Sequence, residues 1–340
     1  MIETLWPFGV ASVYSSIMSA MVSAMRSITI GVSELPTALR LFHDVMGLRI
    51  ESREPLSKPR AGFWNLPAGA TGEVVELSCQ GYPMGRLRLL SLSPTPSETV
   101  RLDTQIGGPD SPLDIGPKAV DFYVRTPAER YWQEMVDAGC IARSKPVRHV
   151  IGDTESEECV LFGPDGVPLL IMVGHRHPVS QLRPGSPHGK YSEVPTVSIV
   201  AGDLAATRSF YADVLGLHAA TDAETPAEFR DRVNALVGIP AGSRVRFLLY
   251  QDLPEPSGKL LLVHFGGASQ RRLTGRMHPA RLGVGLFEHS TPDLEALHLR
   301  CAAAGMVVVA PPARVDGQRM MLVRGPNEEL FEFIERRNKD

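Results

Sequence analysis

Charged and aromatic residues lie within several short apolar runs of this 340-residue sequence. Side chains of these kinds could bind or activate an oxygenated molecule. Arg86 and Arg88 lie in the run RLRLL, and Asp121 and Tyr123 lie in the run VDFYV. An arginine can hold a carboxylate, phenolate or enolate by paired hydrogen bonds. A carboxylate such as Asp121 can act as a general base, and a tyrosine can donate to a developing oxyanion. These residues indicate acid–base chemistry, provided that the fold brings them together.

The sequence carries no motif for several other kinds of chemistry. It contains no phosphate-binding loop, dinucleotide fingerprint or adjacent nucleophile–histidine arrangement. The net charge is −3 with both signs interspersed, so nucleic acid is not an expected partner. The cysteines have no CxxC spacing, which argues against a disulfide framework or a structural zinc site and favours a cytoplasmic location. They are Cys79, Cys140, Cys159 and Cys301.

Residues 1–25 form an apolar, Ser- and Ala-rich stretch. It carries Glu3 and no basic residue before Arg26, unlike a signal peptide. Pro7 and Gly9 interrupt it, and it is too polar to span a bilayer, so no membrane partner is expected. We expect a loose extension outside the fold.

Internal repeats decide the organisation of the chain. Residues 34–48 align without a gap over residues 203–217, and both end in Asp-Val-x-Gly-Leu. Each segment follows a β-prone run and has the apolar spacing of an amphipathic helix that ends at a glycine. Residues 66–92 match residues 239–265 as turn, strand, turn, strand. The length difference between the copies falls in the loop regions around 49–65 and 218–238.

Two further units have the same form, with a strand and helix at their start and a Gly-Pro-Asp/Asn turn between strands at their end. The chain therefore contains four modules, and a Pro-, Gly-, Ser- and His-rich segment, 174–193, is expected to be a linker. The modules lie near residues 26–92, 117–173, 194–266 and 280–336.

These modules resemble those of the vicinal-oxygen-chelate superfamily. The resemblance is carried by the helix end FYADVLGL and by the GPDG turn. That superfamily includes glyoxalase I, extradiol ring-cleavage dioxygenases, 4-hydroxyphenylpyruvate dioxygenase and antibiotic-resistance proteins. The resemblance implies an α+β fold in which four βαβββ modules pair into two tandem glyoxalase-like domains. The expected bounds are an extension at 1–25, domain 1 at 26–173, a linker at 174–193 and domain 2 at 194–340.

The resemblance also implies a cup whose floor holds a divalent metal on His and Glu side chains of the first and last strands of each module. Only Glu332 among the matching positions is a metal-competent residue, whereas about three protein ligands are normally needed. We therefore expect that the family metal is lost and that the chain has no cofactor. A pair in the linker, His175 and His177, is the alternative metal site. The matching positions are Ser27 and Arg88, Ala119 and Leu170, Thr196 and Leu261, and Gly283 and Glu332.

Alternation along the strands then selects the residues that face each cup. The N-terminal cup is expected to be polar, with Asp121 and Tyr123 beside Arg88. An ion pair that merely fills the cup is the alternative for each residue. The expected roles are catalytic for Asp121, Tyr123 and Glu332, and substrate-binding for Arg88, Arg86, Ser27 and Glu76. The C-terminal cup is expected to receive Thr196, Ser198, Leu261, Phe287 and Glu332.

The sequence thus favours an enzyme that acts on a small oxygenated organic molecule without the family metal. Its reaction would be of the lyase, isomerase, hydrolase or diverged ring-cleavage type. A metal-free binding protein that sequesters a small molecule or antibiotic is the alternative, and a pseudo-enzyme that serves only assembly is a third. The expected partner is a small-molecule ligand, and a homo-oligomer is left open.

Overall fold

The computed structural model describes residues 20–101, 111–176, 190–253, 255–267 and 269–336. The expected fold class is confirmed, because each module has a strand and a helix followed by three further strands, or four in module two. Module one contains β1 (Ser27–Val32), α1 (Leu35–Leu39), η2 (Arg40–Val45), β2 (Arg49–Pro55), α2 (Lys58–Phe63), β3 (Thr71–Ser78) and β4 (Arg86–Ser93). Module two contains β5 (Gly116–Tyr123), α3 (Ala128–Asp137), β6 (Ile141–Ala142), β7 (Val147–Ile151), β8 (Thr154–Phe162), η3 (Pro164–Gly166) and β9 (Pro168–Arg176).

The second half of the chain repeats this order. Module three contains β10 (Thr196–Ala201), α4 (Leu204–Arg208), η4 (Ser209–Val214), β11 (His218–Glu224), η5 (Ala227–Phe229), α5 (Arg230–Val237), β12 (Arg244–Gln251) and β13 (Lys259–Gly266). Module four contains β14 (Gly283–Thr291), α6 (Leu294–Ala303), β15 (Val307–Val315), β16 (Gln318–Arg324) and β17 (Leu330–Glu335). The loop regions at 49–65 and 218–238 hold strands β2 and β11 and helices α2 and α5.

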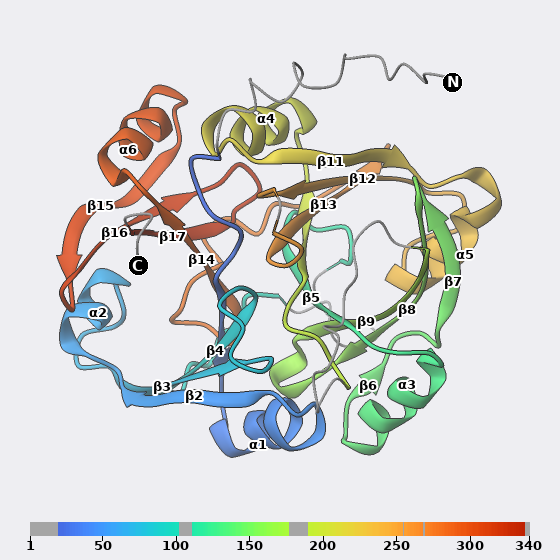
Figure 1. Ribbon diagram of the computed structural model, residues 1–340, viewed down its shortest axis with the longest axis horizontal. Helices are drawn as coiled ribbons and strands as arrows, with labels where there is room; N and C mark the ends of the chain where they lie inside the picture. Colours follow the sequence, from blue (N-terminus) through green and yellow to red (C-terminus); the bar gives the residue numbers. More distant parts are fainter. Residues whose placement is uncertain (1–19, 102–110, 177–189, 254, 268, 337–340) are drawn as a thin grey trace, which may run out of the picture.

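Two curved sheets are assembled from these modules, and each sheet joins one module from either half of the chain (Figure 1). Modules one and four form an eight-stranded sheet in the order β15-β16-β17-β14-β1-β4-β3-β2. Modules two and three form a nine-stranded sheet in the order β11-β12-β13-β10-β5-β9-β8-β6, and β7 pairs with β8. The expectation that consecutive modules share one cup is therefore wrong, while the bounds of the two tandem segments remain a prediction.

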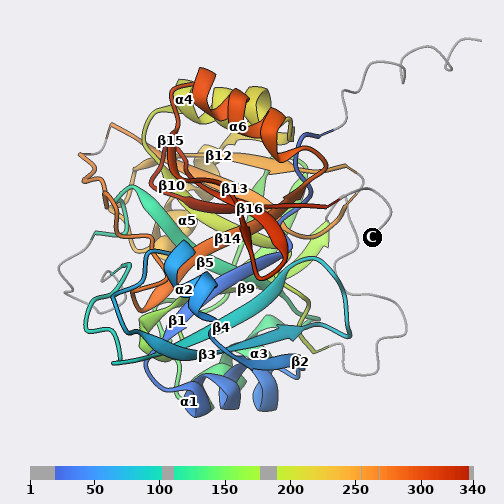
Figure 2. The same ribbon diagram turned by 90° about the vertical axis from the view of Figure 1, so that its left-hand side faces the viewer.

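Helices α1, α3, α4 and α6 lie on the outer sides of the sheets, whereas α5 lies on the concave side of the nine-stranded sheet (Figure 1). In both views α4 and α6 are at one end of the molecule, and α1 and α3 are at the opposite end (Figures 1 and 2). On β1 the apolar residues Ile28, Ile30 and Val32 belong to the core under these helices, as alternation predicts. The polar residues between them are left for the concave side. None of the helices in the described ranges has the length and apolarity needed to cross a membrane.

Local sequence explains how the repeated helices begin and end. The Asp203 carboxylate accepts hydrogen bonds from the backbone N–H groups of Ala205 and Ala206, which caps α4. Gly47 lies just after η2 with a φ of +78°, and Gly216 lies just after η4 with a φ of +69°. An L side chain is disfavoured in that left-handed conformation, so glycine ends the helix and turns the chain into the next strand.

The segment before β1 corrects the expected extension at 1–25. Residues 1–19 lie outside the described residues, but Val22 and Met25 are buried in the core. The backbone N–H of Met21 donates to Leu215 O, and that of Met25 donates to Gly258 O. Residues 20–25 therefore bridge the two halves of the chain, because their apolar side chains are more stable in this core than in water.

The linker prediction is tested only at its ends. Strand β9 continues to Arg176, and Tyr191 and Glu193 are buried. Residues 177–189, which include His177, lie outside the described residues. His175 lies 3.2 Å from a carboxylate oxygen of Glu157.

Candidate functional site

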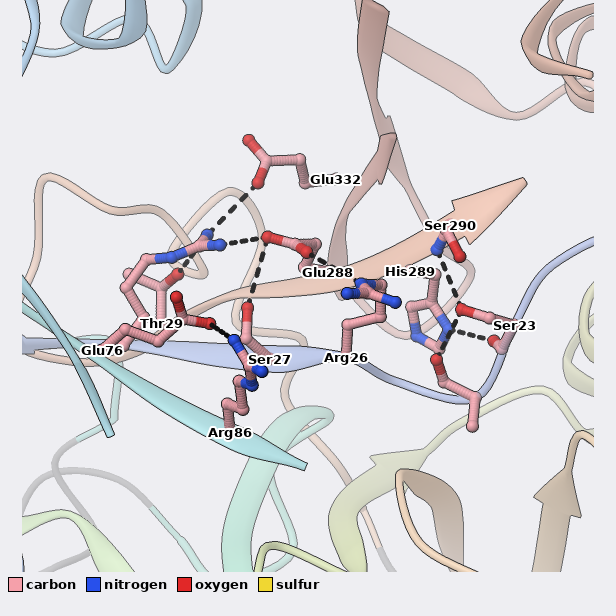
Figure 3. Close-up of polar contacts among 12 residues, drawn as sticks. Ser23, Arg26, Ser27, Thr29, Glu76, Arg86, Glu288, His289, Ser290 and Glu332 are labelled. Carbon is pink, nitrogen blue, oxygen red and sulfur yellow. Dashed lines mark hydrogen bonds and ion pairs between the residues drawn. The ribbon is translucent and has the colours of Figure 1, made fainter. Parts of the chain in front are cut away.

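The concave side of the eight-stranded sheet is centred on the guanidinium of Arg88. Its Nη2 donates to Glu288, and its Nη1 donates to Glu332 Oε2 at 3.3 Å and to Thr29 Oγ1 at 3.4 Å. Ser27 Oγ donates to Glu288 Oε2 at 3.3 Å. Figure 3 shows Ser27, Thr29, Glu288 and Glu332 directed toward one another from strands β1, β14 and β17. The cluster is thus a buried arginine held by two carboxylates and two hydroxyl groups.

Burial and mutual attraction set the charges of this cluster. Burial alone would lower the pKa of Arg88, but the two glutamates raise it above its ordinary value. Burial alone would raise the pKa of Glu288, but Arg88 holds it below its ordinary value. Burial raises the pKa of Glu332, and Arg88 only partly offsets this. Arg88 and Glu288 therefore form the ionised pair, and Glu332 receives a further hydrogen bond of 2.7 Å from the indole N–H of Trp64.

Glu288 is a residue that the sequence interpretation missed. Thr29 and Ile30 pair with Leu286 and Val284, so Gly285 is an extra residue on β14. Such a bulge reverses which side chains face the cup. As a result Glu288 faces the cup in place of Gly283. Phe287 turns away from it and lies 5.8 Å from Phe331, measured between ring centroids, which corrects the expected position of Phe287 in a cup.

The nine-stranded sheet encloses a different kind of site. Its cavity has a volume of about 90 Å³ and is lined mostly by apolar side chains, including Leu170, Val200 and Leu261. Helix α5 contributes Val233 and Leu236 to this lining. The small volume and apolar walls favour a compact, mainly apolar ligand.

Asp121 lies in this apolar cavity and is 1% exposed. Its carboxyl group accepts hydrogen bonds from Ser198 Oγ, which lies 3.3 and 3.4 Å from the two oxygens. Burial, reinforced by the Glu158 carboxylate, raises the pKa of Asp121 well above its ordinary value. A carboxyl group with a raised pKa keeps its proton to higher pH and, when protonated, can donate it in a hydrogen bond to a ligand oxygen.

His149 and Glu158 line the same cavity from β7 and β8. Nε2 of His149 lies 3.3 Å from Oε2 of Glu158. Burial alone would lower the pKa of His149, but Glu158 raises it above its ordinary value. The ring is 1% exposed, and neither ring nitrogen has a hydrogen bond of good geometry within the described ranges. A buried ring with unused hydrogen-bonding capacity beside a cavity is a candidate ligand contact.

The structure divides the predicted site residues between the two sheets. Arg88, Arg86, Ser27, Glu76 and Glu332 belong to the eight-stranded sheet, where Arg86 Nη1 lies 3.2 Å from Glu76 Oε1. Asp121 and Tyr123 belong to the nine-stranded sheet, so the expectation that they lie beside Arg88 is wrong. The physical reason is that β5 hydrogen-bonds to β10 and β9, whereas β4 hydrogen-bonds to β1 and β3.

Tyr123 is only indirectly connected with the apolar cavity. It is 3% exposed and packs with Val160, Leu170 and Met172 in the same cup, but it is not among the residues that line the cavity. Nζ of Lys259 lies 5.9 Å from the centroid of its ring. Ser198 and Leu261, which were expected in a more apolar C-terminal cup, line this cavity, and Thr196 is buried on the same strand as Ser198.

The sequence contained a weak signal for His149 and Glu158. On β8 the residues Glu158, Val160 and Phe162 alternate into the cavity, so period two could have selected Glu158. Strands β6 and β7 pair one after the other with β8 and together take the place of β2, β11 and β15, but the segments compared between modules did not include residues 141–159. His149 therefore fell outside the repeat alignment on which the cup residues were chosen.

The residues at the family's ligand positions do not fit a divalent metal. Glu288 and Glu332 are the carboxylates that could bind one, but both already bind the guanidinium of Arg88. A cation placed between them would meet the positive charge of Arg88 at short range. The described residues contain no cluster of three or more His, Cys, Asp or Glu side chains able to hold a metal.

Comparison with known proteins agrees with this architecture. Residues 193–333 match the model of the Glyoxalase/Bleomycin resistance protein/Dioxygenase superfamily. Glyoxalase I from Zea mays has 12% sequence identity and a TM-score of 0.60, and the match covers 92% of either chain. A putative dioxygenase from Bacillus subtilis has 14% identity and a TM-score of 0.59, and covers 93% of this chain and 86% of its own. A search of curated protein sequences finds no match.

The comparisons complement one another along the chain. The family model matches the second half directly, and the similarity to glyoxalase I extends the same fold over nearly all of the chain. Four βαβββ modules in two sheets agree with both findings. Residues 193–333 therefore match the Glyoxalase/Bleomycin resistance protein/Dioxygenase superfamily, and the chain as a whole shares the fold of glyoxalase I and of the putative dioxygenase.

Proposed function

We propose that the chain is an enzyme that binds a compact, mainly apolar carbonyl compound in the cup of the nine-stranded sheet and transfers a proton on it. In the proposed reaction, no divalent metal takes part. The observation that carries it is the position of Asp121, a buried carboxyl group with a raised pKa, in an apolar cavity shared with the His149–Glu158 pair. Perturbed titratable groups that converge on a cavity favour a catalytic site.

The two groups have complementary chemical roles in this proposal. Asp121, in its protonated form, donates a hydrogen bond to the carbonyl oxygen and stabilises the negative charge that develops there. Ser198 donates to the same carboxyl group, which leaves the acid proton available for the ligand. His149 in its neutral form accepts a proton from the carbon next to the carbonyl, and Glu158 stabilises the resulting imidazolium. The reaction class is therefore isomerisation or elimination through an enol.

A binding protein that sequesters the same ligand remains the second candidate. The apolar walls favour it, because burial of apolar surface alone gives affinity. The two candidates differ in one measurable property. An enzyme of the proposed class exchanges the protons next to the ligand carbonyl with solvent, whereas a binding protein does not.

The test begins with a thermal-shift screen of small cyclic ketones, each paired with the hydrocarbon of the same shape. Ketones that raise the melting temperature more than their hydrocarbon partners are then incubated with the protein in D₂O, and exchange is followed by ¹H NMR. We expect exchange in the wild type, a loss of 10²-fold or more in His149→Gln, and weaker ketone preference in Asp121→Asn.

Matched controls separate chemistry from general damage. His218 and Asp153 are exposed residues outside the cavity lining, so His218→Gln and Asp153→Asn should exchange as fast as the wild type. Ketone binding without exchange would support the binding protein. Equal stabilisation by ketones and hydrocarbons would contradict the role of Asp121 in either candidate.

A further inference from the structure

A second, larger cavity opens on the concave side of the eight-stranded sheet, in front of Arg88. Its volume is about 440 Å³, which lies within the range of small-molecule sites. In contrast to the apolar cavity, its lining is dominated by charged groups. Five arginines line it: Arg26, Arg60, Arg86, Arg88 and Arg336.

Three of these arginines have their charge matched by carboxylates. Arg88 binds Glu288 and Glu332. Arg86 lies 3.2 Å from Glu76, and Arg60 lies 3.4 Å from Asp316. Glu54 lines the cavity at its exposed rim and has no ion pair with a described residue. The inner wall is therefore neutralised except at Arg26 and Arg336.

Arg26 forms an ion pair with Glu288, a carboxylate that already binds Arg88. Its Nε lies 3.6 Å from Oε1 of Glu288, whose other oxygen accepts from Arg88, and this Nε makes no hydrogen bond with a described residue (Figure 3). Nε of Arg336 is likewise buried without a hydrogen-bond partner in the described ranges. Burial and the like charge of Arg336 lower the pKa of Arg26.

We propose that this cavity binds the oxyanion of a small organic molecule, a carboxylate or a phosphate, between Arg26 and Arg336. An oxyanion there would offset the like charges of the two guanidinium groups and would accept hydrogen bonds from the guanidinium N–H groups that face the cavity. Glu288, which is paired with Arg88, would hold Arg26 in position, and the ligand would not contact the Arg88–Glu288 pair. This site is independent of the proposed proton-transfer site, because it uses the other sheet and none of the same residues.

Inorganic phosphate and malonate distinguish the two oxyanion sources. Each is titrated into the full chain by calorimetry and thermal shift, with ionic strength held constant by sodium chloride because exposed charges are screened by salt. We expect at least one anion to raise the melting temperature above the chloride control. A preference for malonate indicates a carboxylate ligand, and a preference for phosphate indicates a phosphorylated one.

Three glutamine variants locate the binding. Arg26→Gln and Arg336→Gln should each raise the dissociation constant of that anion about tenfold or more. Arg53→Gln should leave it unchanged, because Arg53 pairs with Glu73 on the exposed surface of the same sheet. Asp121→Asn should also leave it unchanged, which separates this site from the proton-transfer site. Binding no stronger than the chloride control, or unaltered binding in either cavity variant, overturns the proposal.

Discussion

Nε2 of His149 lies 3.3 Å from Oε2 of Glu158, and both residues line the apolar cavity that also contains Asp121. One β-hairpin, β7–β8, thus places a base and its partner beside a buried acid. Glu158 influences both groups, since its charge raises the pKa of His149 and that of Asp121. The pH dependence of stability should therefore report on each of them.

Asp121→Asn should change how the stability of the unliganded protein depends on pH. Burial raises the pKa of Asp121 in the folded state, whereas the unfolded state ionises near the ordinary pKa of 3.8. Wild-type stability therefore falls as pH rises above that value, until the folded pKa is passed. The asparagine variant lacks this loss, so its relative free energy of unfolding should increase by up to about 1.4 kcal/mol per pH unit. Parallel urea-denaturation curves from pH 4 to pH 7 would contradict the raised pKa.

His149→Gln should show the opposite kind of dependence. The folded pKa lies above 6.5, so the imidazolium–Glu158 pair stabilises the fold fully below pH 6.5 and loses this effect as pH rises through the folded pKa. The difference in melting temperature between wild type and His149→Gln should shrink over that window. In Glu158→Gln only the burial effect remains, so stability should instead be lost as pH falls. No difference between the glutamate and the glutamine background would show that the pair is not formed.

Arg88→Met should strongly destabilise the eight-stranded sheet. It removes the cation and leaves Glu288 and Glu332 buried, a situation that typically costs about 3–5 kcal/mol. Replacing the two glutamates by glutamine in the Arg88→Met background should recover much of that free energy of unfolding. Exposed Arg53→Met is the control and should cost less than about 1 kcal/mol. A small loss in Arg88→Met, measured by denaturant unfolding, would mean that the cluster is open to water.

The metal prediction follows from the same cluster. Because Arg88 lies between the two carboxylates, we expect no stoichiometric first-row metal at Glu332 after the purified protein is incubated with Zn²⁺ or Ni²⁺ and dialysed. Elemental analysis measures this directly. One equivalent of metal that is lost in Glu332→Ala would contradict the expectation, whereas loss only after His175 and His177 are changed would support the linker site.

The sequence was sufficient for the modules but insufficient for their pairing. Residues 34–48 and 203–217 share apolar spacing and terminal glycines, which are local properties, and the structure confirms their helices. All four modules have similar sequence patterns. The local sequence of a module therefore does not indicate whether it shares a sheet with the other module of its own half of the chain or with a module of the other half. The pairing of β1 with β14 and of β5 with β10 depends on tertiary packing.

The site was only partly predictable for related reasons. Alternation correctly predicted that Arg88 faces a cup, because β4 is a regular strand. The bulge at Gly285 reversed the side chains after it, so Glu288 was missed and Phe287 was placed on the wrong side. The partner of Arg88 therefore could not be identified from spacing alone. His149 was missed because β6 and β7, which together take the place of β2, β11 and β15, lay outside the segments compared between modules.

The most direct test of the proposed function is to fill the apolar cavity. Val200 lines that cavity from β10, and Val200→Phe adds enough volume to occupy much of its roughly 90 Å³. We predict that this variant, if folded as judged by circular dichroism, loses ketone binding and proton exchange while it retains oxyanion binding in the other cup. Unchanged ketone affinity in Val200→Phe, measured by isothermal titration calorimetry, would contradict the placement of the ligand beside Asp121 and His149.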